Sequence, residues 1–513
     1  MDSIHTKGTC FVDNYGRERI FNGVNIVDKG SYFLNEKIYD YLWNEEDVIN
    51  IKNLGFNVIR LGFTWDAVEP EMGVYNEKYL DKLAEIISLC EKHEIYVYLD
   101  CHQDLYANNF CFGDGAPKWA VLNDGEKWSK PVGIWAEGYF YSKAVMNCFE
   151  NFWQNKEVNG KGLIDRYADM WQHVAKRFAN CPNLIGFDIL NEPYPGKDGI
   201  KIFTTIIEAA VKLTSEDAGY TYKSLDLLKH FKKGTKTEFL TMIAKVCGRL
   251  KSKKMLNLFL KRFNNEKGFH EIVTTATPYI KKFDEEYYTP FMNKVSKKIR
   301  EVTDNGIIFM ENSYFSNLGI PYSAEPVTIN GKREEKLAFA PHGYDIFVDS
   351  PLYNFSNNER AISIFKEHKN SQNRLNMPVL VGEFGGFASG TNWLHHIDFI
   401  FDYFNSNKWS CTYWHYDKLL LTPDKKHHFS RPYPQAVCGK IDFFSYDRFS
   451  KVFSMNFECD KDYKETKTIV YLHEKVKEII CDCSYNLSSL SETTSKLFID
   501  SPLGKHRLQV QFE

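Results

Sequence analysis

The chain has 513 residues, of which 43% are hydrophobic and 26% are charged, a balance that excludes wholesale disorder. No apolar run reaches the ~20 residues of a membrane-spanning helix, and the N-terminal stretch lacks the apolar centre of a secretion signal, so we expect a cytoplasmic protein. The net charge of −3 is too small to imply a nucleic-acid partner.

Short runs of β-branched and aromatic residues alternate with longer amphipathic stretches along the first four fifths of the chain. This alternation is typical of parallel strands joined by crossover helices, and eight such repeats in about 420 residues predict a closed (β/α)8 barrel. The predicted strands are 21–27, 57–62, 96–102, 184–192, 306–312, 336–344, 378–384 and 411–417.

Residues 199–300 are more than a barrel crossover needs, so we predict a helical insertion between the fourth and fifth strands. Within 223–267, thirteen Lys or Arg residues stand against three Asp or Glu residues, with apolar residues between them at helical spacing. Two interpretations stay open. The basic amphipathic helices make a peripheral contact with an anionic membrane surface, or they form a flap whose basic face is merely solvated.

The helical pattern stops after about residue 425, where short and partly alternating strands begin. In the last of them, Leu508, Val510 and Phe512 alternate with polar residues, as on a half-buried sheet face. The sequence therefore predicts two domains, a barrel over 1–424 and an antiparallel β-sandwich over 425–513.

Polar side chains gather where the predicted barrel strands end. Active sites of such barrels lie at the C-terminal ends of the strands, and a purely structural barrel has little reason to concentrate polar groups there. The residues at these ends are Asp28, Lys29, Arg60, His102, Asp104, Asn191, Glu192, Glu311, His342, Glu383 and Trp414.

Two glutamates among them suit glycoside hydrolysis, which needs one carboxylic acid to protonate the leaving oxygen and one carboxylate near the anomeric carbon. Glu192 ends the fourth strand in FDILNEP, and Glu383 ends the seventh in VLVGEFGG. The ends of these strands face each other across a barrel mouth, so the two side chains can meet. Asn191, beside the predicted acid, can donate to a sugar 2-hydroxyl.

The surroundings of the pair fit different roles. Two nearby carboxylates do not both ionise easily, so Glu192 should keep its proton to higher pH while Glu383 is charged. We expect Arg60 and Tyr314 to hold Glu383 in its ionised form. Glycines 385–386 should leave room for a sugar ring beside it.

At these residues the sequence resembles glycoside hydrolase family 5, and within it the endoglycoceramidases and the related glucocerebrosidases. An HQD run followed by a G-x-P-x-W-A loop is far more specific to these enzymes than N-E-P alone. The resemblance covers nearly the whole barrel and its junction with the β-sandwich, in GFNVIRLGFTWDAVEPEMGVYN, YLDCHQDLYANNFCFGDGAPKWAV, IGFDILNEPYPG, APHGYD, VLVGEFGG, YWHYD and RPYPQAVCGKI.

The resemblance implies hydrolysis, with retention, of the β-linkage between glucose and ceramide in glycosphingolipids. It implies Glu192 as acid/base, Glu383 as nucleophile and Asn191 as the ligand of the 2-hydroxyl, and no metal or organic cofactor is expected. It also assigns positions around the substrate: Lys29, His102 and Asp104 on the glucose hydroxyls, Tyr314, Arg60 and His342 around the nucleophile, and Trp414 as the floor under the sugar.

Three alternatives remain beside an endoglycoceramidase. The chain is a cytosolic glucosylceramidase restricted to glucosylceramide, a family 5 β-glucanase acting on soluble polysaccharide, or a glycolipid-binding protein without turnover. The absence of an evident signal peptide and the long basic insertion set the sequence apart from the secreted endoglycoceramidases. Oligomeric state is not predicted.

Overall fold

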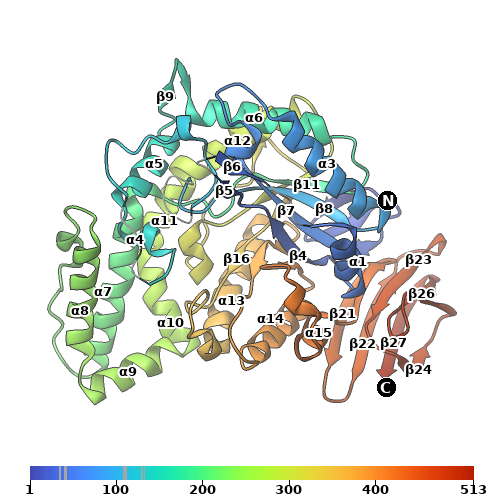
Figure 1. Cartoon of the computed structure of the whole chain (residues 1–513). Helices are drawn as coiled ribbons and strands as arrows, with labels where there is room; N and C mark the ends of the chain where they lie inside the picture. The colour runs from blue at the N-terminus through green and yellow to red at the C-terminus, as the bar shows by residue number, and fades with distance from the viewer. Residues whose placement is uncertain (34–35, 40–42, 108–112, 129–130, 132) are drawn as a thin grey trace.

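The computed structural model describes residues 1–33, 36–39, 43–107, 113–128, 131 and 133–513. At its centre, eight parallel strands form one sheet that curls into a barrel (Figure 1). Each of these strands overlaps one of the eight predicted runs. They are β4 (Asn22–Val27), β7 (Val58–Thr64), β8 (Tyr96–His102), β11 (Leu184–Asp188), β12 (Ile307–Met310), β15 (Leu337–Phe339), β17 (Leu380–Val381) and β19 (Ser410–Tyr413).

The barrel closes between β15 and β17 through a parallel bridge from Phe339 to Val379. Beyond this bridge, β16 (His342–Gly343) pairs in parallel with β18 (Glu383–Phe384), so that His342 lies opposite Glu383. The predicted (β/α)8 fold is confirmed. The closing seam brings the ends of the predicted sixth and seventh strands together.

Amphipathic helices cover the outside of the barrel. α3 (Glu77–Lys92) begins where the Asn76 side chain accepts from the backbone N–H of Tyr79, and it buries Leu80, Leu83 and Ile87 at helical spacing. The other helices around the barrel are α1 (Glu45–Asn53), α2 (Trp65–Val68), α4 (Glu137–Tyr141), α5 (Lys143–Trp153), α6 (Leu163–Phe178), α13 (Asn358–Leu375), α14 (Leu394–Asn407) and α15 (Pro423–Phe429).

The chain between β11 and β12 is helical, as the sequence predicts for 199–300. The last of its helices packs beside α6, where Lys294 pairs with Asp165 at 2.5 Å. The first three stand at the left edge of Figure 1. The helices are α7 (Gly199–Asp217), α8 (Lys236–Leu250), α9 (Lys253–Phe263), α10 (Glu266–Val273), α11 (Thr277–Phe283) and α12 (Thr289–Arg300).

Two antiparallel sheets form the C-terminal part of the molecule. One contains β21 (Lys440–Asp447), β22 (Val452–Cys459), β24 (Val476–Cys481) and β27 (Gly504–Phe512). The other contains β20 (Tyr433–Val437), β23 (Tyr463–Leu472), β25 (Tyr485–Ser489) and β26 (Ser495–Ser501). Leu508, Val510 and Phe512 are buried in the core that the two sheets share, as their alternation predicts.

The N-terminus joins the second of these sheets, which the sequence did not indicate. Strands β1 (Ile4–Lys7), β2 (Cys10–Asp13) and β3 (Glu18–Arg19) extend it, and β3 pairs with β20. Arg19 donates from Nε to the carbonyl oxygen of Gln435 at 2.9 Å and from Nη1 to the hydroxyl of Tyr96 on barrel strand β8 at 3.4 Å. It thereby ties the sheet to the barrel. Among the described residues, no helix combines the length and the hydropathy needed to cross a membrane.

Candidate active site

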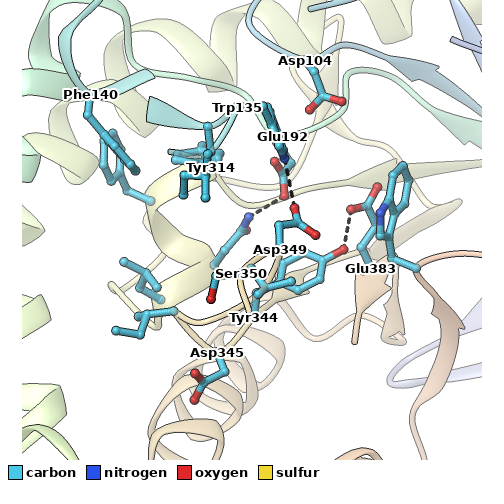
Figure 2. A pocket seen from close by; sticks show the side chains of 18 of the residues that line it. Asp104, Trp135, Phe140, Glu192, Tyr314, Tyr344, Asp345, Asp349, Ser350 and Glu383 are labelled. Carbon is cyan, nitrogen blue, oxygen red and sulfur yellow. Dashed lines mark hydrogen bonds between the residues drawn. The ribbon is translucent and has the colours of Figure 1, made fainter. Parts of the chain in front are cut away.

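A cavity of ≈ 920 Å³ lies at the C-terminal ends of the barrel strands (Figure 2). One end is polar, and most of the side chains predicted to bind substrate line it. The other end is apolar and is formed largely by helices between β11 and β12. The polar lining includes Lys29, His102, Asp104, Asn191, Glu192, Tyr314, Tyr344, Glu383 and Trp414.

Glu192 and Glu383 converge in this cavity, although 191 positions separate them in the sequence. A carboxylate oxygen of each lies within 4.8 Å of the other and of a ring nitrogen of His342. Carboxyl groups about 5–5.5 Å apart are typical of retaining glycosidases, whereas inverting enzymes leave room for a water molecule between them. The separation therefore favours direct attack on carbon by one of the two carboxylates.

Glu383 is held in place by two donors. Buried Arg60 donates from Nη1 to Glu383 Oε1 at 2.6 Å, and the hydroxyl of Tyr344 donates to Glu383 Oε2 at 2.7 Å. The same guanidinium donates from Nε to Asp188 at 2.8 Å and from Nη2 to Glu311 at 2.5 Å. Both oxygens of Glu383 therefore face hydrogen-bond donors, which fix the orientation of the carboxylate.

The tyrosine beside Glu383 is Tyr344 and not the predicted Tyr314. Tyr314 lies across the cavity, where its ring packs on Tyr139 with centroids 4.4 Å apart, and Figure 2 shows it on the side of Phe140. A signal for Tyr344 was present in the sequence. It stands two positions after His342 in HGY, so in an extended strand both side chains point to the same face.

Glu192 has a different set of partners. Asn317, which the sequence analysis did not identify, donates from Nδ2 to Glu192 Oε1 at 2.6 Å, and Nδ1 of His342 lies 3.2 Å from the same oxygen. The backbone N–H of Glu192 donates to Glu311 Oε2 at 2.7 Å. This bond helps to hold Glu192 at a φ of 43°, which is rare for residues other than glycine.

These surroundings set the protonation of Glu192 and of His342. Burial, assisted by the charge of Glu383 and opposed by the hydrogen bond from His342, raises the pKa of Glu192 to about 7. Burial lowers the pKa of His342, but the carboxylates of Glu311 and Glu383 outweigh it and hold that pKa well above its usual value. A proton is thus available on Glu192 at neutral pH, as the sequence predicts.

Lys29, His102, Asp104 and Trp414 form one cluster at the polar end. Lys29 pairs with Asp104 and lies 5.0 Å from the centre of the Trp414 ring, and the His102 ring stacks on Trp414 at 5.3 Å. Burial raises the pKa of Asp104, but Lys29 and His102 outweigh it and bring the pKa to about 2. The cluster offers an anion, cations and an apolar ring, which suit sugar hydroxyls and a sugar face.

Asn191 is fixed at both ends of its amide. Its Oδ1 accepts from Arg60 Nη2 at 3.1 Å, and its Nδ2 donates to the carbonyl oxygen of Gln103 at 3.1 Å. Because an amide nitrogen carries two hydrogens, one donor remains for a ligand. The predicted contact with a sugar 2-hydroxyl is compatible with this orientation.

The path of the chain requires glycines after Glu383. Gly385 and Gly386 have φ of 108° and 133°, where other residues are strained. A Cβ on Gly385 would lie 2.1 Å from the ring of Tyr413. Gly385 therefore lets the chain turn tightly against Tyr413, and the room for a sugar ring beside Glu383 stays a prediction.

The apolar end of the cavity is built by helices α7, α9 and α10, together with the loop after β16. Their side chains converge opposite the carboxylates. The apolar lining includes Phe140, Phe203, Ile206, Ile207, Phe263, Phe269, Ile272, Val273, Phe315, Leu318, Ile346, Val348 and Phe387.

Clusters of acidic and histidine side chains at the barrel mouth have the spacing of metal ligands, but each faces a cationic side chain. In the His102, Asp104 and Asp114 cluster, Lys29 pairs with both acids. Arg60 donates into the cluster of Asp100, Asp188 and Glu311. Such cations compensate the carboxylates and oppose a bound metal ion.

Comparison with known proteins identifies the family. The sequence matches the cellulase family (glycosyl hydrolase family 5) over residues 12–219 and 264–419, and the glycoside hydrolase family 5 C-terminal domain over residues 431–507. The chain belongs to glycoside hydrolase family 5 and is a glycoside hydrolase, as the motifs indicate. Residues 220–263 lie outside the match.

Several relatives are named endoglycoceramidase. The one from Cyanea nozakii is 34% identical over 216 residues, which are 38% of this chain and 42% of that protein. The one from Hydra vulgaris is 24% identical over 92% of this chain and 81% of its own length. Among solved structures, endoglycoceramidase II from Rhodococcus sp. shares the fold with a TM-score of 0.70 at 20% identity, covering 99% of this chain and 100% of that one.

Proposed function

We propose that this glycoside hydrolase cleaves the β-linkage between glucose and ceramide in glycosphingolipids, with retention at the anomeric carbon. One observation carries the proposal. A single cavity joins a pair of glutamates and a polar, sugar-sized end to an apolar end lined by phenylalanines and isoleucines. A sugar joined to a lipid matches both ends of this cavity, with the scissile bond between them.

In the first step, Glu383 attacks the anomeric carbon while Glu192 gives its proton to the ceramide oxygen, so the C–O bond breaks and ceramide leaves as an alcohol. The product is a glycosyl ester on Glu383. In the second step, Glu192 takes a proton from water, whose oxygen attacks the same carbon and releases Glu383. The pKa of about 7 suits Glu192 to both directions of proton transfer.

The polar end binds the glucose in this proposal. Asn191 donates to the 2-hydroxyl, where a hydrogen bond strengthens as positive charge develops on the ring. Lys29, His102 and Asp104 bind other hydroxyls, and Trp414 supports the apolar face of the sugar. Arg60 and Tyr344 hold Glu383 by hydrogen bonds and aim it at the anomeric carbon.

The apolar end distinguishes this function from that of a glucanase acting on soluble polysaccharide. A glucan has hydroxyls on both sides of the bond that is cut, so it needs polar partners along the whole cleft. Beyond Glu192, the cavity instead meets Phe203, Ile206 and Ile207 of α7 and Phe269 of α10. Such a wall suits the hydrocarbon chains of ceramide.

Headgroup length divides the proposal into two candidates. Relatives named endoglycoceramidase favour cleavage beneath longer sugar chains. A relative from Cryptococcus neoformans named glucosylceramidase, 26% identical over 39% of this chain, favours a glucosylceramidase. Since ceramides reside in membranes, we extend the proposal to a peripheral membrane contact through residues 223–267. A cytoplasmic location stays a prediction.

Product analysis tests the function. The purified chain is incubated with glucosylceramide, lactosylceramide and a ganglioside, each carrying a fluorescent acyl chain in detergent, and the products are separated. Release of fluorescent ceramide from glucosylceramide supports the proposal, and intact oligosaccharide from the other two identifies an endoglycoceramidase. Turnover of cello-oligosaccharides with all three lipids left intact would contradict it.

A further inference from the structure

The outer surface of residues 220–263 has no role in the barrel. This segment, the basic hairpin, contains helices α8 and α9 and lies outside the match to the family. It is an ordered element. α8 starts with a capping box between Thr235 and Glu238, and it is anchored by Phe239 and Met242 in a small core with Tyr141. In Figure 1 the basic hairpin lies at the edge of the molecule remote from the C-terminal sheets.

Large apolar side chains point outward from the basic hairpin. Each exposes between 36% and 46% of its surface. On each helix they are three or four positions apart, so they share one face of that helix. The residues are Leu228 before α8, Leu240 and Ile243 on α8, and Leu256 and Leu260 on α9.

Positive charge is concentrated on the same segment. Residues 220–263 carry twelve basic residues against two acidic ones, although the whole chain has a net charge of −3. The acidic residues are already engaged. Asp226 pairs with Lys229 at 3.0 Å, and Glu238 caps α8. The excess charge therefore has to be compensated from outside the segment.

The basic hairpin is continuous with the apolar end of the cavity. α9 ends at Phe263, which lines the cavity. Phe203 and Ile207 of α7 also line it, and both pack against the small core that anchors α8. Helix α9 thus contributes to the wall for the lipid and also carries exposed Leu256 and Leu260.

We infer that the basic hairpin docks on the surface of an anionic phospholipid bilayer. Lysine ammonium groups contact the phosphates and carboxylates of the headgroups, and the exposed leucines enter the interface, as on an amphipathic surface helix. The cavity then opens beside the membrane from which the glycolipid comes. This last consequence depends on the proposed function, whereas docking itself does not.

Vesicle binding tests the inference directly. The full chain is sedimented with vesicles of phosphatidylcholine alone and of phosphatidylcholine with phosphatidylserine. We expect binding to the second kind only, and release as salt is raised, since salt screens exposed charges. Equal binding to both kinds, or binding that salt does not weaken, would overturn the proposal.

Matched charge reversals locate the surface. The hairpin variant changes four exposed lysines to Glu and should lose binding by about tenfold or more. Its control makes the same charge change on exposed lysines of the C-terminal sheets and should bind like the wild type. The hairpin variant is Lys232→Glu, Lys236→Glu, Lys251→Glu and Lys253→Glu, and the control is Lys440→Glu, Lys464→Glu, Lys477→Glu and Lys505→Glu.

A soluble substrate separates docking from catalysis. Both variants should hydrolyse an aryl β-glucoside at the wild-type rate, which shows that they fold, while the hairpin variant alone loses activity on glucosylceramide in anionic vesicles. Equal binding losses in the two variants would overturn the docking inference. If the wild type hydrolyses neither the aryl β-glucoside nor glucosylceramide, the proposed function is contradicted. The vesicle-binding result would still test docking by itself.

Discussion

Glu192 and Glu383 differ in what surrounds them. Glu383 receives hydrogen bonds on both oxygens, from Arg60 and from Tyr344. Glu192 is buried near the negative charge of Glu383, and these conditions favour its protonated form. The same residue type can thus act as nucleophile at one position and as acid at the other.

The pH profile follows from the state of Glu192. The first step needs Glu192 protonated and its pKa is about 7, so kcat/KM on glucosylceramide should fall as pH rises through about 7. Asn317→Ala removes a donor to the charged form of Glu192 and should move this alkaline limb to higher pH. Measured pH–rate profiles of both proteins check this, and a limb that stays in place or moves to lower pH would refute it.

Replacement of Glu192 tests its role as acid when two substrates with different leaving groups are compared. Glu192→Gln should lower kcat on glucosylceramide by about 10²- to 10⁴-fold, because ceramide leaves poorly without a proton. An acidic phenol departs from an aryl glucoside without being protonated. Cleavage of such a glucoside to the glycosyl–enzyme should therefore slow much less. Equal loss on both substrates would argue against the role of acid.

The two tyrosines at the site make a matched pair. Tyr344→Phe removes a hydrogen bond to a charged carboxylate, and such bonds contribute about 1.5–3 kcal/mol, so we expect kcat/KM to fall about 10- to 100-fold. Tyr314→Phe should have a much smaller effect, since its ring packs on Tyr139 in either form. Kinetics of both variants on an aryl glucoside decide between them. A larger effect at Tyr314 would restore the prediction made from the sequence.

At the level of elements, one short strand pair and three helices define much of the cavity. The pairing of β16 with β18 places His342 and Tyr344 next to Glu383. Helices α7, α9 and α10 supply the apolar wall. The barrel thus provides the chemistry, and the helices after β11 select what is attached to the sugar.

A charge on the apolar wall tests the contribution of α7. Ile206→Asp should lower kcat/KM on glucosylceramide by more than about tenfold, because the bound lipid would desolvate a carboxylate. Cleavage of an aryl β-glucoside should be retained. The control is Ile49→Asp on α1, where the side chain is 39% exposed. Equal loss on both substrates would show that Ile206 supports the fold and not the lipid.

The whole molecule has three parts with different roles. The barrel gathers residues from the ends of its strands, the C-terminal sheets take in strands β1–β3 from the N-terminus, and the basic hairpin stands at the opposite edge (Figure 1). Arg19 links the sheets to barrel strand β8 through Tyr96. The N-terminal segment is therefore structurally part of the C-terminal sheets.

Periodic features of the sequence predicted much of this arrangement. The eight strands follow from alternation of apolar runs with amphipathic helices, and Glu192 and Glu383 follow from their positions at strand ends. Contacts set by tertiary packing were less accessible. The resemblance to the family placed Tyr314 beside Glu383, but the loop after the fifth strand turns its ring toward Tyr139.

Long-range pairing explains the other differences. Asn317 reaches Glu192 from a 3₁₀ turn that follows β12, and neither its spacing nor its residue type marks it. Strand β3 pairs with β20 more than 400 positions away, and local patterning carries no information about that partner. The glycines after Glu383 were identified, but the close approach of Gly385 to Tyr413 appears only in three dimensions.

Trapping of the glycosyl–enzyme tests the central claim, that Glu383 attacks the anomeric carbon. A 2-deoxy-2-fluoro-β-glucosyl fluoride slows both steps, because the fluorine at C2 opposes positive charge on the ring, while its good leaving group keeps the first step fast enough for the ester to accumulate. Mass spectrometry of peptic peptides should find the sugar on Glu383, and Glu383→Gln should take up none. A sugar on any other residue, or turnover that needs no Glu383, would contradict the account.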